Sequence, residues 1–337
     1  MRELETLSQA RLFPESLSAA APVCGCPAAR WPDVAGKGPG GEVRRLDAAS
    51  AAPYEHLTFP YLQPTLSRMP EGVRALGVAT GGEPLGLLVG RATGVGPWEV
   101  LSLCVAAPWR GVGIGTALVE RFAREAGAGG APGVRIGYTV QRSTPGLERV
   151  LCKSGFTAPA VEAVVYTFEH SLGEAPWLRL GRLPPPLAAV PWVDLSADAV
   201  AAVRAGSGTA YPAYLDPLAA GPPEPACSLA LIAGGQVAGW CIALAAAPDA
   251  LLYASLFVRE DLRGVGCAGA LLAASVRRHL ACGIPRGVCA VRRDNPGMAR
   301  LADRLFAPYA VRATERRTAM RPLGSAAAAR AREGAEA

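Results

Sequence analysis

Apolar residues in this sequence occur in two kinds of run. Short, nearly continuous apolar runs predict buried strands, whereas apolar residues three and four positions apart predict a helix with one buried face. In the first half the predicted order is a strand at 42–47, one or two short helices at 54–69, strands at 73–80, 84–92 and 98–105, a helix at 116–125, a strand at 134–140, a helix at 145–154 and a strand at 161–169. Helices and strands alternate within one unit, which predicts an α/β fold.

The second half of the chain repeats this order. The segment YLQP at 61–64 recurs as YLDP at 214–217, and GGEPLG at 81–86 recurs as GGQVAG at 234–239, each 153 residues later. Unrelated matches would not all recur at the same spacing of 153 residues. The chain therefore contains one unit in two copies, each close to the size of a typical domain.

A glycine-rich turn lies at the centre of each copy. RGVGIG at 110–115 follows the apolar run 101–105, and RGVGCA at 263–268 follows the apolar run 252–258. Each turn is followed by a predicted helix. A glycine turn between a strand and a helix exposes unpaired backbone N–H groups at the positive end of the helix dipole. Both turns therefore predict a site for an anion.

This strand–Arg-x-x-Gly-x-Gly/Ala–helix unit, followed by Gly155-Phe156, resembles the GCN5-related N-acetyltransferase (GNAT) family over about residues 42–170 and 188–321. The resemblance implies a tandem, two-domain member. The fold class is then α/β (α+β), with two GNAT-like domains that are each a mixed, mainly antiparallel splayed sheet flanked by helices.

The resemblance also implies which residues bind acyl-CoA. In the family the strand before the turn splays from its neighbour and pairs with the pantetheine arm, and the turn's amides hold the diphosphate. This assigns the pantetheine to Leu103 and Val105 in the first copy and to Phe257 and Val258 in the second. The diphosphate is assigned to Arg110, Gly111, Val112, Gly113, Ile114, Gly115 and Thr116, and to Arg263, Gly264, Val265, Gly266, Cys267, Ala268 and Gly269.

Glu99 is the candidate general base. It lies six residues before Val105, where the histone acetyltransferase branch of the family has a glutamate base. Its apolar neighbours on the strand predict desolvation and a raised pKa, which suits a base near neutral pH. The alternative is an exposed carboxylate at a strand edge. The second copy has Leu252 at the matching position and so lacks this base.

The general acid departs from the family pattern. Many members carry a tyrosine five residues before the phenylalanine of the Gly-Phe pair, where this chain has Leu151. Tyr138, on the strand after the turn, is the candidate substitute. A tyrosine that only packs in the core, with water protonating the departing thiolate, is the alternative.

The composition of the chain restricts which kinds of partner the protein is expected to bind. The 337 residues are 50% hydrophobic and 18% charged, which is typical of a globular chain, and the net charge of +6 is scattered, without a basic run that would indicate nucleic-acid binding. The uncharged stretch 225–248 is long enough to span a membrane, but Gly234-Gly235 divides it into a hairpin, so we expect no membrane contact. Nine irregularly spaced cysteines predict reduced thiols, a cytoplasmic location and no metal site.

The expected organisation is a flexible or peripheral segment at 1–41, an N-terminal GNAT-like domain at 42–170, a Pro-rich linker at 171–187, a C-terminal GNAT-like domain at 188–321 and an Ala-rich tail at 322–337. The N-terminal domain is favoured as the catalytic one.

The expected function is an acyl-CoA-dependent N-acyltransferase. Acetyl-CoA or another acyl-CoA would be the co-substrate, and the acyl group would pass directly to a primary amine of a small molecule or peptide. In one alternative the C-terminal domain is catalytic and the N-terminal domain is structural. In another the chain is a non-catalytic CoA-binding or partner-binding module. The protein would be a monomer with an internal pseudo-dimer, or a homodimer.

Overall fold

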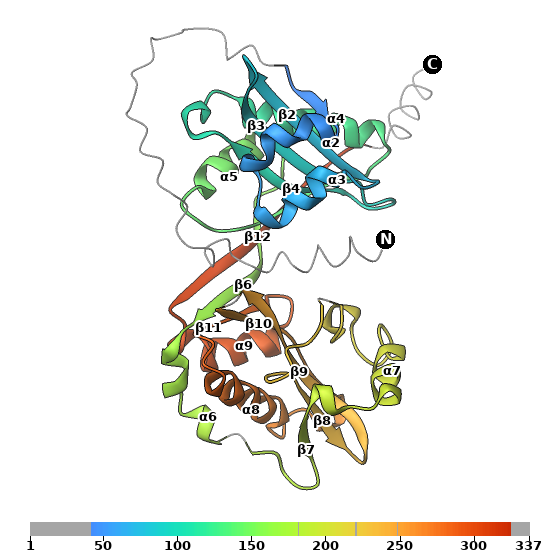
Figure 1. Ribbon diagram of the computed structural model, residues 1–337, viewed down its shortest axis with the longest axis vertical. Helices are drawn as coiled ribbons and strands as arrows, with labels where there is room; N and C mark the ends of the chain where they lie inside the picture. The colour runs from blue at the N-terminus through green and yellow to red at the C-terminus, as the bar shows by residue number, and fades with distance from the viewer. Residues whose placement is uncertain (1–41, 181, 220, 248, 325–337) are drawn as a thin grey trace. The chain divides into compact units, whose positions relative to one another are not determined.

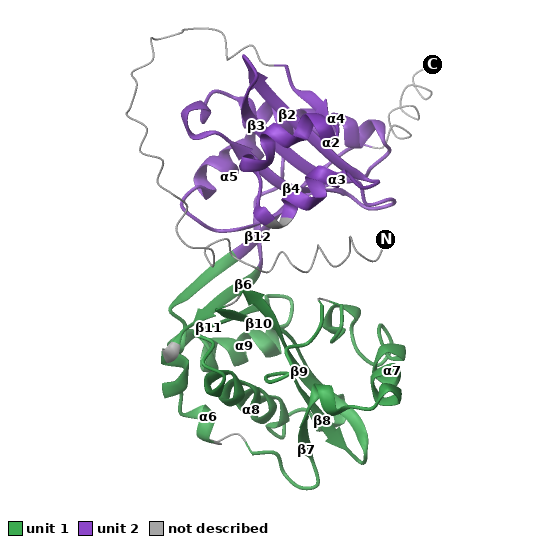
Figure 2. Ribbon diagram, viewed as in Figure 1, with its two compact units in different colours: residues 1–21, 163–315 green, residues 22–162, 316–337 purple. Residues whose placement is uncertain are grey.

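The computed structural model describes residues 42–180, 182–219, 221–247 and 249–324 (Figure 1). The segment 1–41 lies outside the described residues, as does the tail from 325 onward. The described residues form two compact units, shown in different colours in Figure 2. Unit 2 comprises 42–162 and 316–324, and unit 1 comprises 163–315.

Unit 2 is one sheet with helices on both faces. Its elements are β1 (Arg44–Leu46), α2 (Ala48–Ala51), η3 (Ala52–Leu57), η4 (Pro60–Leu62), α3 (Gln63–Arg68), β2 (Val73–Thr80), β3 (Glu83–Arg91), β4 (Trp98–Val105), η5 (Ala107–Trp109), α4 (Ile114–Ala128), β5 (Gly133–Thr139), α5 (Thr144–Lys153), and parts of β6 (Ala160–Phe168) and β12 (Arg312–Pro322). The sheet order is β1-β2-β3-β4-β5-β12, antiparallel except between β4 and β5.

Two hydrophobic layers enclose this sheet. The helices α4 and α5 pack on one face through a core that includes the fully buried Leu118, Phe122 and Leu151. On the opposite face α2, η3 and α3 pack through a core that includes Tyr54 and Leu66. Helix α4 lies close to the sheet because β3 has glycine beneath it. A Cβ atom at Gly86 would lie 2.7 Å from Ile114 Cγ2, so β3 fixes where the first turn of α4 begins.

Unit 1 has the same plan. Its elements are η6 (His170–Glu174), α6 (Trp177–Leu180), β7 (Ala188–Pro191), η7 (Trp192–Asp194), α7 (Ala197–Ala205), η8 (Ala213–Leu215), β8 (Leu229–Ala233), β9 (Gln236–Ala247), β10 (Ala250–Val258), η9 (Glu260–Leu262), α8 (Cys267–Ala281), β11 (Arg286–Arg292), α9 (Pro296–Leu305) and η10 (Ala307–Tyr309). The sheet order is β6-β11-β10-β9-β8-β7, antiparallel except between β10 and β11.

The last strand of each repeat pairs in the other unit. Residues 163–168 of β6, encoded by the first copy, pair with β11 in unit 1. Residues 316–322 of β12, encoded by the second copy, pair with β5 in unit 2. The units therefore differ from the contiguous segments 42–170 and 188–321 that the repeat suggests. The repeat is compatible with either pairing, since β5 and β11 are equivalent strands that both accept an antiparallel neighbour.

The expected fold class is confirmed. Each unit is a mixed, mainly antiparallel sheet with helices on both faces, and the predicted strands lie within one or two residues of β2, β3, β4, β5 and β6. Both sheets also splay at their single parallel pair, as described below.

We expect Gly90→Ala to lower the free energy of unfolding by about 1–3 kcal/mol. A Cβ atom there would lie 2.3 Å from Cζ of Phe122, which is fully buried and has no room to move. Urea unfolding measures the change. The control is Gly146→Ala, because its Cβ would meet nothing within 4 Å. Wild-type stability for Gly90→Ala would contradict the described packing of α4 on β3.

Candidate functional site

The two glycine turns have the same backbone geometry. Gly111 and Gly113 have φ of +88° and +98°, and their counterparts Gly264 and Gly266 both have φ of +84°. These values lie in the left-handed region, which glycine adopts without steric cost. The second glycine of each pair is the N-cap residue of the helix that follows, α4 or α8.

Neither helix start is capped by a side chain. No side chain accepts a hydrogen bond from the N-terminal amides of α4 or of α8, and neither first turn contains an acidic residue. Unsatisfied N–H groups and the positive end of the helix dipole together attract an anion. Both turns are exposed, so a ligand can reach them.

An arginine side chain ties each turn to the strand before it. The Arg110 Nε donates to the carbonyl oxygen of Val105 at 3.0 Å, and the Arg263 Nε donates to that of Val258 at 3.0 Å. The equal distances show that the motif arginine has the same place in both copies. Each guanidinium group remains exposed beside the anion site.

The strands before the turns splay from their parallel neighbours. The β4–β5 register runs only from Trp98↔Val134 to Val100↔Ile136, so Leu103 and Val105 lie beyond it. The β10–β11 register likewise ends at Tyr253↔Cys289, five residues before Val258. Main-chain groups past these points face an opening in the sheet instead of a partner strand.

A β-bulge begins each splay. The register of β4 against β3 shifts between Ser102 and Val100, which leaves Leu101 as the extra residue. The register of β10 against β9 shifts between Tyr253 and Ser255, which leaves Ala254, the residue 153 positions after Leu101. Bulges commonly occur next to functional sites because they release backbone groups from the ladder.

The structure places the expected cofactor residues differently in the two copies. Leu103 and Val105 are half-buried and pack on the α4 side of β4. Leu256, not Phe257, is the counterpart of Leu103, because the two occupy equivalent positions in the register with β9 and β3. The Phe257 ring is buried on the opposite face, with ring centroids 4.7 Å from Trp240.

Within the turns, the side chains divide into two groups. Ile114 and Cys267 are buried in the two cores, so only their main chains can face a ligand, while Val112 and Val265 are exposed. Gly115 allows a close approach, since a Cβ there would lie 3.3 Å from Val150 Cγ2 on α5 and 3.7 Å from Val105 Cγ2. The end of β4, the start of α4 and the helix α5 therefore meet at Gly115.

The approaches to the turns differ in charge. The residues before Arg110 in η5 carry no charge, whereas η9, before Arg263, contains the exposed Glu260 and Asp261. Asp261 is ion-paired with Arg259 at 2.6 Å, which offsets its charge, so the difference between the two approaches comes from Glu260. An anionic ligand is therefore favoured more strongly at the first turn.

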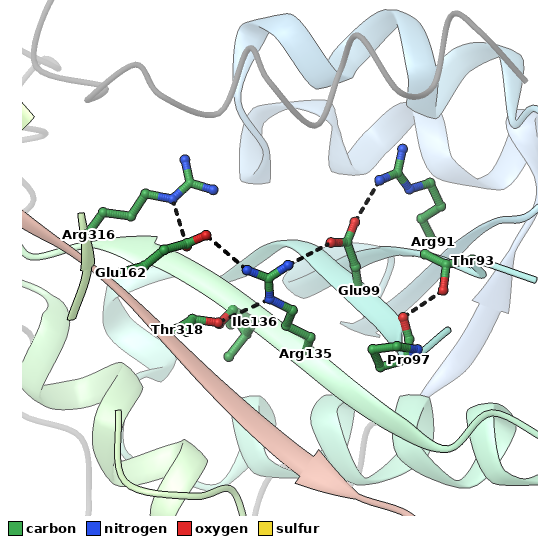
Figure 3. Close-up of polar contacts among 9 residues, drawn as sticks. All are labelled: Arg91, Thr93, Pro97, Glu99, Arg135, Ile136, Glu162, Arg316 and Thr318. Atoms are coloured by element: carbon green, nitrogen blue, oxygen red, sulfur yellow. Dashed lines mark hydrogen bonds and ion pairs between the residues drawn. The ribbon is translucent and has the colours of Figure 1, made fainter. Parts of the chain in front are cut away.

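Glu99 does not lie in the apolar environment expected from its strand. Its carboxylate pairs with Arg91 on β3 at 2.6 Å and with Arg135 on β5 at 3.8 Å, and its side chain is 12% exposed (Figure 3). The flanking residues are apolar, but neighbouring strands contribute cations on the same face. The expectation of an apolar environment was wrong because it considered the strand alone.

The ion pairs extend into a chain of charges across the sheet of unit 2. Arg135 also binds Glu162 on β6 at 3.0 Å, and Glu162 contacts Arg316 on β12 at 3.3 Å (Figure 3). We call Arg91, Glu99, Arg135, Glu162 and Arg316 the charge chain. Its last member comes from the second repeat, so the strand exchange completes it.

Tyr138 donates its hydroxyl proton to Glu148 Oε1 on α5 at 2.7 Å. Burial, together with the neighbouring Glu148, raises the pKa of Tyr138 well above its usual value. The hydrogen bond from Tyr138, followed by Arg317 at 2.9 Å, lowers the pKa of Glu148. Leu151, at the position of the family's tyrosine, is buried in the core. Sequence reasoning missed Glu148 because its proximity to Tyr138 depends on how α5 packs.

A metal-binding cluster and a membrane-spanning helix are both absent from the described residues. No group of three or more His, Cys, Asp or Glu side chains in them is arranged to hold a metal ion. None of the helices in this part of the chain is long and apolar enough to cross a membrane.

Comparison with known proteins identifies the family of the first copy. Residues 42–156 match the family model described as Acetyltransferase (GNAT) family. Among curated proteins, none matches the sequence.

Solved structures match over most of the chain. A tandem GNAT protein from the clavulanic acid biosynthesis pathway is 18% identical, with 84% of this chain and 99% of that chain covered and a TM-score of 0.60. A GCN5-related N-acetyltransferase from Sphaerobacter thermophilus is also 18% identical, with 84% and 96% covered and a TM-score of 0.60. At these identities the likeness concerns the fold.

The resemblance inferred from the two turns is thus confirmed. The chain has the fold of tandem GNAT proteins, and its residues 42–156 match the model of the GNAT acetyltransferase family. The family that residues 42–156 match is one of acetyltransferases.

Proposed function

We propose that the protein transfers an acyl group from acyl-CoA, with acetyl-CoA as the donor to test first, directly to a primary amine of a small molecule or peptide, and that unit 2 holds the donor. The observation that carries this proposal is the uncapped start of α4 beside the splayed end of β4. The helix start suits a diphosphate, and the part of β4 beyond its register with β5 suits an amide-bearing arm that pairs with main-chain groups.

Two differences between the copies support unit 2 as the catalytic one. The second turn is preceded by Glu260, which repels a diphosphate, whereas the residues before the first turn carry no charge. Position 99 is a carboxylate, whereas its counterpart Leu252 is buried and has no group that could accept a proton.

In the proposed reaction the neutral amine nitrogen attacks the thioester carbonyl carbon. A carbon–nitrogen bond forms, the carbon–sulfur bond breaks, and the amine loses one proton while the thiolate gains one. We assign the amine's proton to Glu99, directly or through one water molecule. The carboxylate that would accept the proton is held between Arg91 and Arg135 by ion pairs of 2.6 Å and 3.8 Å.

We assign the proton that the thiolate gains to Tyr138, and Tyr138→Phe is expected to lower kcat about a hundredfold with unchanged acyl-CoA affinity. Because its pKa is raised, the phenol stays protonated at every pH below 10. Steady-state kinetics tests this. Tyr166→Phe is the matched control, since Tyr166 makes the same kind of bond to Asp303, at 3.0 Å, in unit 1. An unchanged kcat for Tyr138→Phe would leave water as the proton donor.

Calorimetric titration of the full chain with acetyl-CoA tests donor binding. The proposal predicts one tightly bound acetyl-CoA per chain. Absence of binding would refute the proposal as a whole.

A second candidate assigns catalysis to unit 1. It is supported by the matching geometry of the second turn, where Gly264, Gly266 and Arg263 reproduce their counterparts. Two equivalent acetyl-CoA molecules per chain, or turnover that survives loss of the first turn, would favour this candidate.

A further inference from the structure

A basic pocket lies on unit 1, away from the glycine turn. Its volume is about 470 Å³, and it is lined by Gly173, Leu178, Arg179, Arg182, Arg277 and Leu280. These residues come from η6, from α6 and the segment after it, and from the C-terminal part of α8. Arg277 is ten residues into α8, about 15 Å along the helix from the turn at its start.

Three arginines and no carboxylate line this pocket. Among the described residues, Arg179, Arg182 and Arg277 form no ion pair, and no acidic side chain lines the pocket. Three like charges at one site repel each other, and this repulsion is relieved when an anion binds between them. Arg286, in the same unit, is instead paired with Asp249.

The pocket also has a fixed part and an apolar wall. The Arg277 side chain donates to the main-chain carbonyl of Leu178, which joins α8 to α6 and holds this guanidinium in place. Leu178 and Leu280 form the wall. At Gly173 a Cβ atom would lie 3.6 Å from Leu280 Cδ1, so a longer side chain would extend into the space that glycine leaves open.

We propose that this pocket binds a small molecule carrying a diphosphate or a comparable group of phosphoryl oxygens, at a site distinct from the acyl-CoA turns. Three arginines match the several negative charges of such a group, and the planar fork of arginine suits phosphoryl oxygens. The leucine wall accommodates an apolar portion of the same molecule. This inference does not depend on which unit is catalytic.

Pyrophosphate is the probe, titrated by calorimetry into the full chain carrying Gly113→Glu and Gly266→Glu, which place a carboxylate in each of the two glycine turns. We expect binding to persist in this background. Arg179→Gln and Arg182→Gln should each weaken it about tenfold, and added NaCl should weaken it further. Arg277→Ala should have at least as large an effect.

Arg278→Ala is the matched control. Arg278 is the next residue on α8, but it bonds to the carbonyl of Ala226 and does not line the pocket. Thermal unfolding of each variant verifies that the fold is retained. Absence of pyrophosphate binding, or binding that Arg179→Gln and Arg182→Gln leave unchanged, would overturn the proposal.

Citrate and a single-stranded oligonucleotide serve as comparison ligands for pyrophosphate. Tighter binding of citrate than of pyrophosphate would overturn the assignment to phosphoryl groups. A single-stranded oligonucleotide that binds through these arginines while pyrophosphate does not would replace it with a polymer-docking surface. Failure here leaves acetyl-CoA binding by the wild-type protein unaffected, so the two proposals are tested separately.

Discussion

Gly113→Glu abolishes acyl-CoA-dependent turnover in this account, whereas Gly266→Glu leaves most of it. Gly113 has φ of +98° and is the N-cap of α4, so the substitution forces a side chain into the left-handed region at about 1–2 kcal/mol. The new carboxylate also lies beside the diphosphate position, where repulsion between close charges costs several kcal/mol. Together these effects predict a loss in kcat/KM of about a hundredfold or more.

A backbone-matched control separates the charge from the strain. Gly130, just after the C-terminus of α4 in the same unit, has φ of +75°, and a Cβ there meets nothing within 4 Å. Gly130→Glu therefore introduces the same side chain at a similar φ, at the opposite end of α4 from the turn. We expect it to reduce stability slightly and to leave kcat/KM unchanged. Full turnover in Gly113→Glu, with turnover lost in Gly266→Glu, would move the donor site to unit 1.

Glu99→Gln is expected to lower kcat about a hundredfold or more, because glutamine cannot accept the amine's proton. Acetyl-CoA affinity should remain near wild type. The substitution also leaves Arg91 and Arg135 without their shared carboxylate, which should lower the free energy of unfolding by about 1–3 kcal/mol.

Glu162→Gln tests whether that loss comes from chemistry or from a disturbed charge chain. Glu162 bonds to Arg135 at 3.0 Å and to Arg316 at 3.3 Å, and its side chain is 16% exposed, close to the 12% of Glu99. Both variants should lose similar stability, but only Glu99→Gln should lose kcat. Equal losses of kcat would reduce Glu99 to a structural member of the charge chain.

The local elements and the two turns could be predicted because their causes are local. The apolar run 98–105 matches β4, and the glycines at 111 and 113 have the positive φ that only glycine adopts easily. Because the second copy repeats the first at a spacing of 153 residues, the elements and the turn predicted for the first copy were also predicted for the second. The assignment to Phe257 was a slip of one residue, because the 153-residue spacing of the repeat already places the counterpart of Leu103 at Leu256.

The exchange of β6 and β12 could not be predicted. Each strand could pair equally well with the sheet of its own repeat or with the sheet of the other repeat, and nothing in its sequence favours one of them. The exchange explains why Arg316 was missed, but it does not explain why the direct partners of Glu99 were missed. Arg91 was within reach of sequence reasoning, since it faces Glu99 across the predicted β3–β4 pair. Arg316 was not, because it reaches this sheet only through the exchange.

The central claim is that this chain transfers an acyl group from CoA to an amine. The most direct measurement incubates the wild-type protein with isotopically labelled acetyl-CoA and a mixed pool of small-molecule and peptide amines, and follows the label by mass spectrometry. The account predicts label in an amide product, with one free CoA thiol released for each amide formed. Acetyl-CoA that binds but transfers no label to any amine would contradict it and identify the protein as a CoA-binding module.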